Sequence, residues 1–230
     1  MSTLRELAQL NSPREAIDLL ASMGLSFAWP LLNIRAEAPG SETFEMELAL
    51  DKWHYEEARQ TLRSETGMVD QLSFALALEA DLANVLTVLR FAQYPHERNR
   101  LRDRLGTDEI AYLFIGPGHI PYEVLTEAFR QDTVISAIET LSGTFFGPAL
   151  RVGLDAYARS NRLSDIERQL NHYRLAWMAG RIRKDPLGIG VVLGYVALKV
   201  NEINNIRWIT QGNNLELKAD AIRAELEMVA

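Results

Sequence analysis

Cysteine is absent from the 230 residues, so disulfides, thiolate metal sites and a cysteine nucleophile are excluded. Basic residues are also few, because 24 Lys and Arg stand against 31 Asp and Glu and leave a net charge of −7. Phosphate contacts need a basic surface, so an acidic chain is a poor nucleic-acid binder. Binding to anionic lipid by charge alone is not expected either.

Targeting and metal-binding motifs are missing as well. The first ten residues lack the basic start and apolar run of a signal peptide. The longest charge-free part of the most apolar stretch, Leu187 to Leu198, is too short to span a bilayer. The histidines do not have metal-ligand spacing; they are His54, His96, His119 and His172. We therefore expect a chain that does not cross the membrane and that carries no metal site.

A glycine cluster is the nearest approach to a nucleotide-binding motif. Gly188, Gly190 and Gly194 lack the preceding strand and the following acidic residue that a dinucleotide site requires. We interpret these glycines as positions where a neighbouring helix approaches closely or where the helix start is loose. Since no other motif points to chemistry, we expect no catalytic residues and no cofactor.

Helical periodicity dominates what is present, and no segment has a convincing strand pattern. Ser12 followed by Pro13 and Glu15 is typical of a helix start. The predicted fold class is all-α, with helices near 12–23, 27–36, 42–63, 68–91, 96–104, 121–130, 132–142, from 148, 164–182, 186–212 and 219–228.

The longest of these patterns runs from Pro186 to Gly212, residues that suit a first helical position and the position just past a helix end. Its wide apolar stripe is interrupted by the polar residues Lys199, Glu202, Asn205 and Arg207. A helix this apolar is expected to be buried on most of its surface, with partners for its polar groups. The pattern predicts a central packing helix.

The chain also contains an internal repeat. Leu4–Leu20 lines up with Leu125–Leu141, and Asp81–Val85 lines up with Glu202–Ile206, each at an offset of 121 residues. Matches in the same order at a nearly constant offset indicate two copies of one helical unit.

This repeat sets the predicted domain boundaries. Residues 1–120 form the first helical repeat, in which 1–11 would be the tail of a missing preceding repeat, and residues 121–230 form the second. Each unit is expected to contain a pair of short helices, then a pair of long antiparallel helices, then a short tail.

A carboxylate and an asparagine three residues apart recur in both units, as Asp81 with Asn84 and as Glu202 with Asn205. Positions three apart share one face of a helix. We expect these side chains to anchor neighbouring short helices by hydrogen bonds to exposed backbone ends.

The motif residues resemble a known family. The segment from Pro186 through Arg223 is similar to the C-terminal signature of the C subunit of the V/A-type rotary ATPases, a relative of the eukaryotic V-ATPase d subunit. The positions that carry the resemblance are Pro186, Gly188, Gly190, Tyr195, Lys199, Glu202, Asn205 and Arg207, and Asp81, Asn84 and Arg90 look like matching parts of the preceding repeat.

The resemblance implies three helical units around a pseudo-threefold axis, of which two are found here, and no catalytic, cofactor or metal residues. It implies a coupling subunit that is peripheral on the cytoplasmic face of the membrane. Such a subunit links the central stalk to the proteolipid ring and transmits torque between proton or sodium transport and ATP synthesis or hydrolysis.

Partner contacts are expected at the open ends of the helix pairs. Basic residues that could make them lie near Gly188 and Gly190, namely Arg181, Arg183 and Lys184. Two alternatives stay open: a soluble helical-repeat adaptor for another protein, and a helical enzyme with a polar pocket between the two units.

Overall fold

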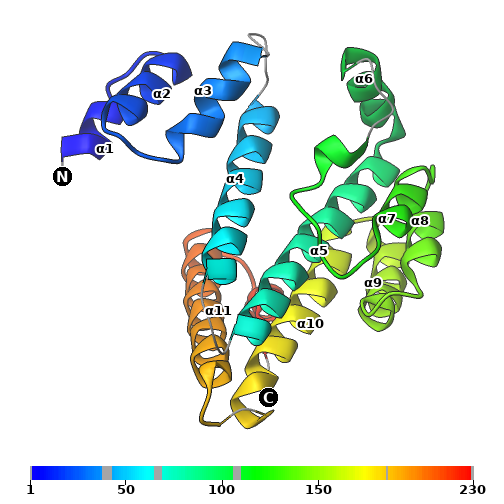
Figure 1. Cartoon of the computed structure of the whole chain (residues 1–230). Helices are drawn as coiled ribbons and strands as arrows, with labels where there is room; N and C mark the ends of the chain where they lie inside the picture. The colour runs from blue at the N-terminus through cyan, green and yellow to red at the C-terminus, as the bar shows by residue number, and fades with distance from the viewer. Residues whose placement is uncertain (1, 38–42, 65–68, 106–109, 185, 229–230) are drawn as a thin grey trace.

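The computed structural model describes residues 2–37, 43–64, 69–105, 110–184 and 186–228 (Figure 1). Within these ranges the chain is helical and has no strand, which confirms the predicted all-α class. The elements are α1 (Ser2–Leu7), α2 (Pro13–Ser22), α3 (Ala28–Glu37), α4 (Thr43–Ser64), α5 (Val69–Gln93), α6 (Pro95–Leu105), the 3₁₀ helix η1 (Ile110–Leu113), α7 (Tyr122–Phe129), α8 (Val134–Leu141), α9 (Gly147–Ser160), α10 (Leu163–Lys184), α11 (Ile189–Asn214) and α12 (Ala219–Glu225).

Capping residues begin two of the short helices, and the start at Ser12 is the one that the sequence predicts. Ser12 caps α2 through its side-chain oxygen, which accepts the backbone N–H of Glu15 at 3.3 Å. Thr133 caps α8 in the same way and accepts the N–H of Ser136 at 3.1 Å. These two helices start at positions 13 and 134, which are 121 residues apart, and 121 is also the offset of the sequence repeat.

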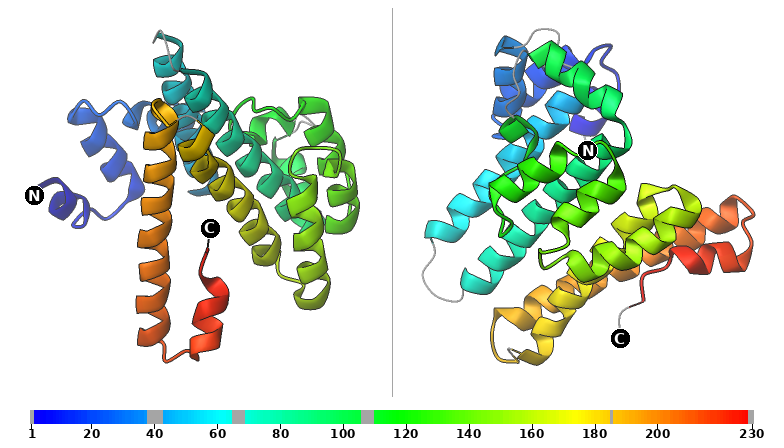
Figure 2. Two further views of the ribbon diagram at one scale, coloured as in Figure 1. Left: turned by 90° about the horizontal axis from the view of Figure 1, so that it is seen from below. Right: turned by 90° about the vertical axis from the view of Figure 1, so that its right-hand side faces the viewer.

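Two long antiparallel hairpins, α4 with α5 and α10 with α11, form the body of the molecule (Figures 1 and 2). Helices α4 and α10 both have 22 residues, and α5 and α11 have 25 and 26. A pair of short helices precedes each hairpin. The division into units at residue 120 stays a prediction, but the helix order of the second half follows that of the first.

The core is centred on α5. This helix packs against α4 of its own hairpin and also against α7, α8 and α10. Val85, Val88 and Leu89 of α5 have no exposed surface, and they belong to one apolar cluster with Leu125 of α7 and Ile138 of α8. Helices from both halves of the chain therefore pack against α5.

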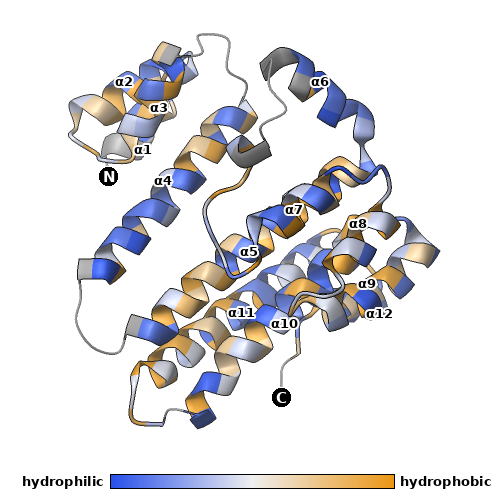
Figure 3. Cartoon of the chain, turned by 45° about the vertical axis from the view of Figure 1, so that its right-hand side comes forward, coloured by the Kyte–Doolittle hydropathy of each residue, from blue (hydrophilic) through white to orange (hydrophobic). Residues whose placement is uncertain are grey.

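Helix α11 differs from its prediction in two respects. It begins at Ile189, after Gly188 as N-cap residue, so Pro186 lies in the turn before the helix and not at its first position. It is also not the central helix, because its buried residues are Gly190, Gly194 and Gly212. Apolar residues occur along α11 (Figure 3), and those of the stripe are exposed, so no helix of the described chain covers them.

Helix α5 contains a long apolar stretch of the kind that can cross a membrane. Among the described residues, Asp70–Gln93 of α5 is long and apolar enough to cross a bilayer, and half of its most apolar window is buried inside the protein. A core helix of a water-soluble protein passes the same test, so this feature is weak evidence for a span.

Candidate functional site

Asp81 lies fully buried on α5 and fastens the segment that leads into α7. Its carboxylate accepts the backbone N–H groups of His119 at 2.6 Å and Ile120 at 3.0 Å. Burial raises the pKa of Asp81, and the two N–H groups and the nearby His119 act in the opposite direction. The carboxylate thus serves as a backbone acceptor ahead of a helix start.

Asn84 lies one turn further along α5 and holds the same segment. Its Oδ1 accepts the N–H of Ile115 at 3.0 Å, and its Nδ2 donates to the carbonyl of Gly116 at 3.0 Å. Gly118 lets the backbone approach, because a Cβ there would lie 2.0 Å from Oδ1 of Asp81. Both side chains therefore make hydrogen bonds of the kind expected from the sequence.

Asn205 makes the matching pair of bonds in the second half. Its Oδ1 accepts the N–H of Glu227 at 3.0 Å, and its Nδ2 donates to the carbonyl of the same residue at 2.9 Å. Asn201 donates to that carbonyl as well, at 2.9 Å. The C-terminal segment after α12 is fastened to α11 as the segment before α7 is fastened to α5.

Glu202 does not follow Asp81. Its side chain is 55% exposed and forms an ion pair at 2.5 Å with Lys199 of the same helix. That partner raises the pKa of Lys199 through a hydrogen bond and through its charge. The expected anchoring role is wrong for Glu202, because no backbone segment covers this face of α11 in the described chain.

The predicted partner-contact residues lie at the turn between α10 and α11. Arg181, Arg183 and Lys184 occupy the last turn of α10, where positive charge complements the helix dipole. The guanidinium of Arg181 lies over the Trp177 ring at 4.4 Å and is half-buried, whereas Arg183 and Lys184 are exposed. Only the latter two are fully presented to a partner.

The remaining motif residues are not gathered into one site. Arg90 is exposed in the last turn of α5, and Pro186 is exposed in the turn before α11. Tyr195 is 58% exposed on α11. Gly194 brings α10 close, since a Cβ there would lie 2.9 Å from the carbonyl oxygen of Met178. This contact fits the interpretation of the glycine cluster as a helix-packing feature.

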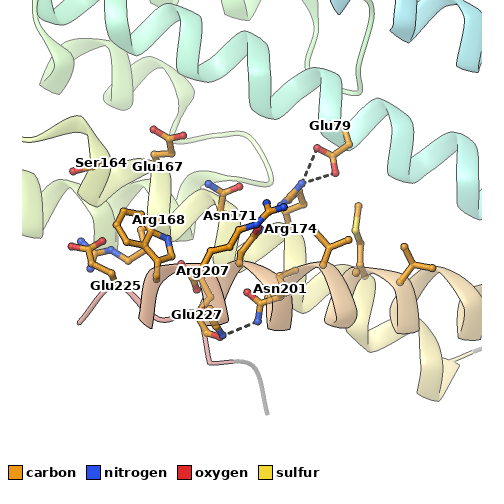
Figure 4. A pocket seen from close by; sticks show the side chains of 18 of the residues that line it. Glu79, Ser164, Glu167, Arg168, Asn171, Arg174, Asn201, Arg207, Glu225 and Glu227 are labelled. Carbon is orange, nitrogen blue, oxygen red and sulfur yellow. Dashed lines mark hydrogen bonds and ion pairs between the residues drawn. The ribbon is translucent and has the colours of Figure 1, made fainter. Parts of the chain in front are cut away.

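A polar cleft of about 740 Å³ lies between α10, α11 and α12 (Figure 4). Two of its arginines have hydrogen-bond partners: Arg174 bonds both carboxylate oxygens of Glu79 at 2.9 and 3.1 Å, and Arg168 donates to the carbonyl of Ala224 at 2.6 Å. His172 lies 3.3 Å from the Glu227 carboxylate. Among the described residues, no cluster of His, Asp and Glu is arranged to hold a metal ion.

Two links between the hairpins were not predicted. Phe74 of α5 stacks on Trp177 of α10 with ring centroids 4.7 Å apart and an interplanar angle of 12°. The ion pair of Glu79 with Arg174 joins the same two helices. The paired positions are about a hundred residues apart in the chain, and no local sequence signal brings such distant positions together.

The described residues form an all-helical scaffold. Two long hairpins pack together, Asp81, Asn84 and Asn205 bond backbone segments to them, and no cluster in this part of the chain is arranged to bind a metal ion. Residues 1–225 match the family model described as ATP synthase (C/AC39) subunit. The chain belongs to this family.

Curated relatives agree with this assignment. The chain is 26% identical over 237 residues to the A-type ATP synthase C subunit of Methanosarcina acetivorans, which covers 98% of this chain and 58% of the relative. It is 26% identical over 168 residues to that of Methanobrevibacter smithii (72% and 41%), and 30% identical over 156 residues to that of Halobacterium salinarum strain R1 (67% and 41%). The chain thus spans about half the length of the curated relatives it matches. No solved structure matches it.

Proposed function

We propose that this chain is a non-catalytic coupling subunit of a rotary ATPase, which links the central stalk to the membrane proteolipid ring. The observation that carries this proposal is the family match over residues 1–225. Relatives named as the C subunits of A-type ATP synthases support it. The protein would lie on the cytoplasmic face of the membrane and would pass torque between ion transport and ATP synthesis or hydrolysis.

A torque-transmitting body has to resist bending, and the packing of the hairpins supports this role. Helix α5 is held on several sides by α4, α7, α8 and α10. The Phe74–Trp177 stack and the Glu79–Arg174 pair tie the first hairpin to the second. Close-packed interiors have low compressibility, so a load applied at one hairpin is carried into the other.

The turn between α10 and α11 is the surface that we assign to a partner in the complex. Arg183 and Lys184 are exposed there, and both are free of the aromatic stacking that holds Arg181. Exposed positive charges at a helix end can meet an acidic partner surface and orient its approach.

Purification from membranes through an affinity tag tests the proposal. Wild-type protein should carry proteolipid and central-stalk subunits with it. The variant with Arg183→Glu and Lys184→Glu should lose at least one of them. Lys218→Glu with Arg223→Glu is the matched control, because it changes the charge equally at the opposite end of α11.

The outcomes of this experiment test the coupling role separately from the choice of the α10–α11 turn as the contact surface. Unchanged binding by the Arg183 and Lys184 variant would exclude this turn as the contact but would leave the coupling role in place. Wild-type protein that brings down no rotary subunit would overturn the coupling role, and purification with an unrelated partner would favour an adaptor.

A further inference from the structure

An apolar stripe on α11 faces away from the rest of the molecule. Its members are between 40% and 58% exposed: Val192, Tyr195, Ile203, Ile206 and Ile209. The opposite side of α11 is occupied, because Gly194 approaches α10 and Asn205 holds the segment after α12. Figure 2 shows α12 lying beside the C-terminal part of α11. The stripe therefore lies on a different face of α11 from these two contacts.

The corresponding apolar stripe on α5 is buried against other helices of the chain. At the offset of 121, Leu82 corresponds to Ile203 and Val85 corresponds to Ile206. The α5 residues are 6% and 0% exposed, whereas their α11 counterparts are 49% and 56% exposed. On α5 this face receives α7, α8 and α10. In this fold the stripe is therefore a surface that other helices cover.

The charges within the stripe indicate what covers it on α11. Lys199 and Glu202 lie at its middle, and they are 51% and 55% exposed. Together with their apolar neighbours they follow the alternating three- and four-residue spacing of coiled-coil core positions, in the series Val192, Tyr195, Lys199, Glu202, Ile206 and Ile209. When two copies of this series run antiparallel, apolar residues lie opposite apolar residues and Lys199 lies opposite Glu202.

We propose that α11 pairs antiparallel with α11 of a second copy and forms a twofold-symmetric dimer of the free protein. With the twofold axis between residues 200 and 201, Lys199 of each copy lies opposite Glu202 of the other. Tyr195 then meets Ile206 across the interface, and Val192 meets Ile209. The contact extends along about 26 Å of helix. It is isologous and closes after two copies.

The ion pair seen within α11 does not oppose this pairing. Lys199 and Glu202 are both exposed, and exposed ion pairs contribute little to stability. Each residue can exchange its partner on the same helix for the opposite charge on the second copy, so both charges stay paired in the dimer. The inference concerns the free protein and does not depend on the proposed coupling function.

Charge variants test the pairing by light scattering coupled to size-exclusion chromatography. Wild type should have twice the 26.0 kDa mass of the chain and should dissociate on dilution. Lys199→Glu alone or Glu202→Lys alone places like charges opposite each other, so each variant should have half the wild-type mass. An equimolar mixture of the two variants should recover the dimer mass, because one helix is then negative and the other positive.

The mixing step distinguishes pairing between copies from the ion pair within one helix, since a contact within one chain cannot be restored by a second chain. Ile206→Asp should abolish the dimer, whereas Ile135→Asp, at a similarly exposed isoleucine on α8, should leave it intact. Helical circular dichroism checks that each variant is folded. A monomeric wild type at every concentration, or a dimer that survives Ile206→Asp, would overturn the proposal.

Discussion

Replacing Asn84 by alanine should cost far more stability than the same change at Asn205, although both residues make the same two bonds. Asn84 is 1% exposed, and its removal leaves the N–H of Ile115 and the carbonyl of Gly116 without their partner inside the protein. Ile115 and Gly116 are half-buried, and an unsatisfied buried polar group costs about 1–3 kcal/mol, so we expect about 2–4 kcal/mol for the two groups together in Asn84→Ala.

The matching change removes the bonds between Asn205 and Glu227 near the C-terminal end of the described chain. Water can replace them there, and Asn201 still donates to the same carbonyl. We expect a loss of about 1 kcal/mol or less for Asn205→Ala. The gain in helix propensity from alanine is the same at both sites and cancels in the comparison.

Urea titration followed by helical circular dichroism measures both free energies of unfolding. For a chain of this size, a loss of about 3 kcal/mol corresponds to a melting temperature lower by about 6–12 °C. Asn214→Ala, at an exposed position at the end of α11, is the control and should change stability by no more than about 0.5 kcal/mol. Equal losses at Asn84 and Asn205 would refute the reasoning that burial sets the cost.

Two further substitutions test the local packing and the charges. Gly118→Ala should lower the melting temperature, because its Cβ would lie 2.0 Å from Oδ1 of Asp81, whereas Gly143→Ala meets no atom within 4 Å and should be neutral; equal effects would contradict the close approach. Asp165 has its pKa lowered by the hydroxyl of Ser160 and by nearby arginines, so its contribution is present above the ordinary pKa of about 4 and is lost as pH falls through the lower folded value. Asp165→Asn should therefore destabilise the protein most near neutral pH, and the gap to wild type in a pH series of thermal melts should close in acid; a gap independent of pH would count against this account.

Local signals in the sequence were sufficient for much of the fold. Ser12 and Thr133 define helix starts through bonds to residues three positions away, and the apolar periodicity predicts the long helices to within a few residues. These features depend on neighbouring residues alone, so a single sequence contains what is needed to predict them.

Burial was harder to predict, as the comparison of α5 with α11 demonstrates. Both helices carry the same apolar face, but in the described chain only α5 has helices from the other half packed against it on that face. The prediction of α11 as the central helix was wrong because periodicity reports which face can be buried and not whether a neighbour is present. Glu202 was misassigned for the same reason. Asp81 accepts hydrogen bonds from the backbone segment before α7, whereas in the described chain no such segment lies against Glu202, which pairs with Lys199.

The position of α5 has a consequence for how this chain can be divided. Its apolar side chains are covered from both halves of the chain, so a protein cut after α5 would present to water the surface that α7 and α8 now occupy. In repeat architectures each unit is stabilised by its neighbours, and an end unit needs a polar outer face to stay soluble. Recombining units of this fold in new orders would therefore require redesign at every new end.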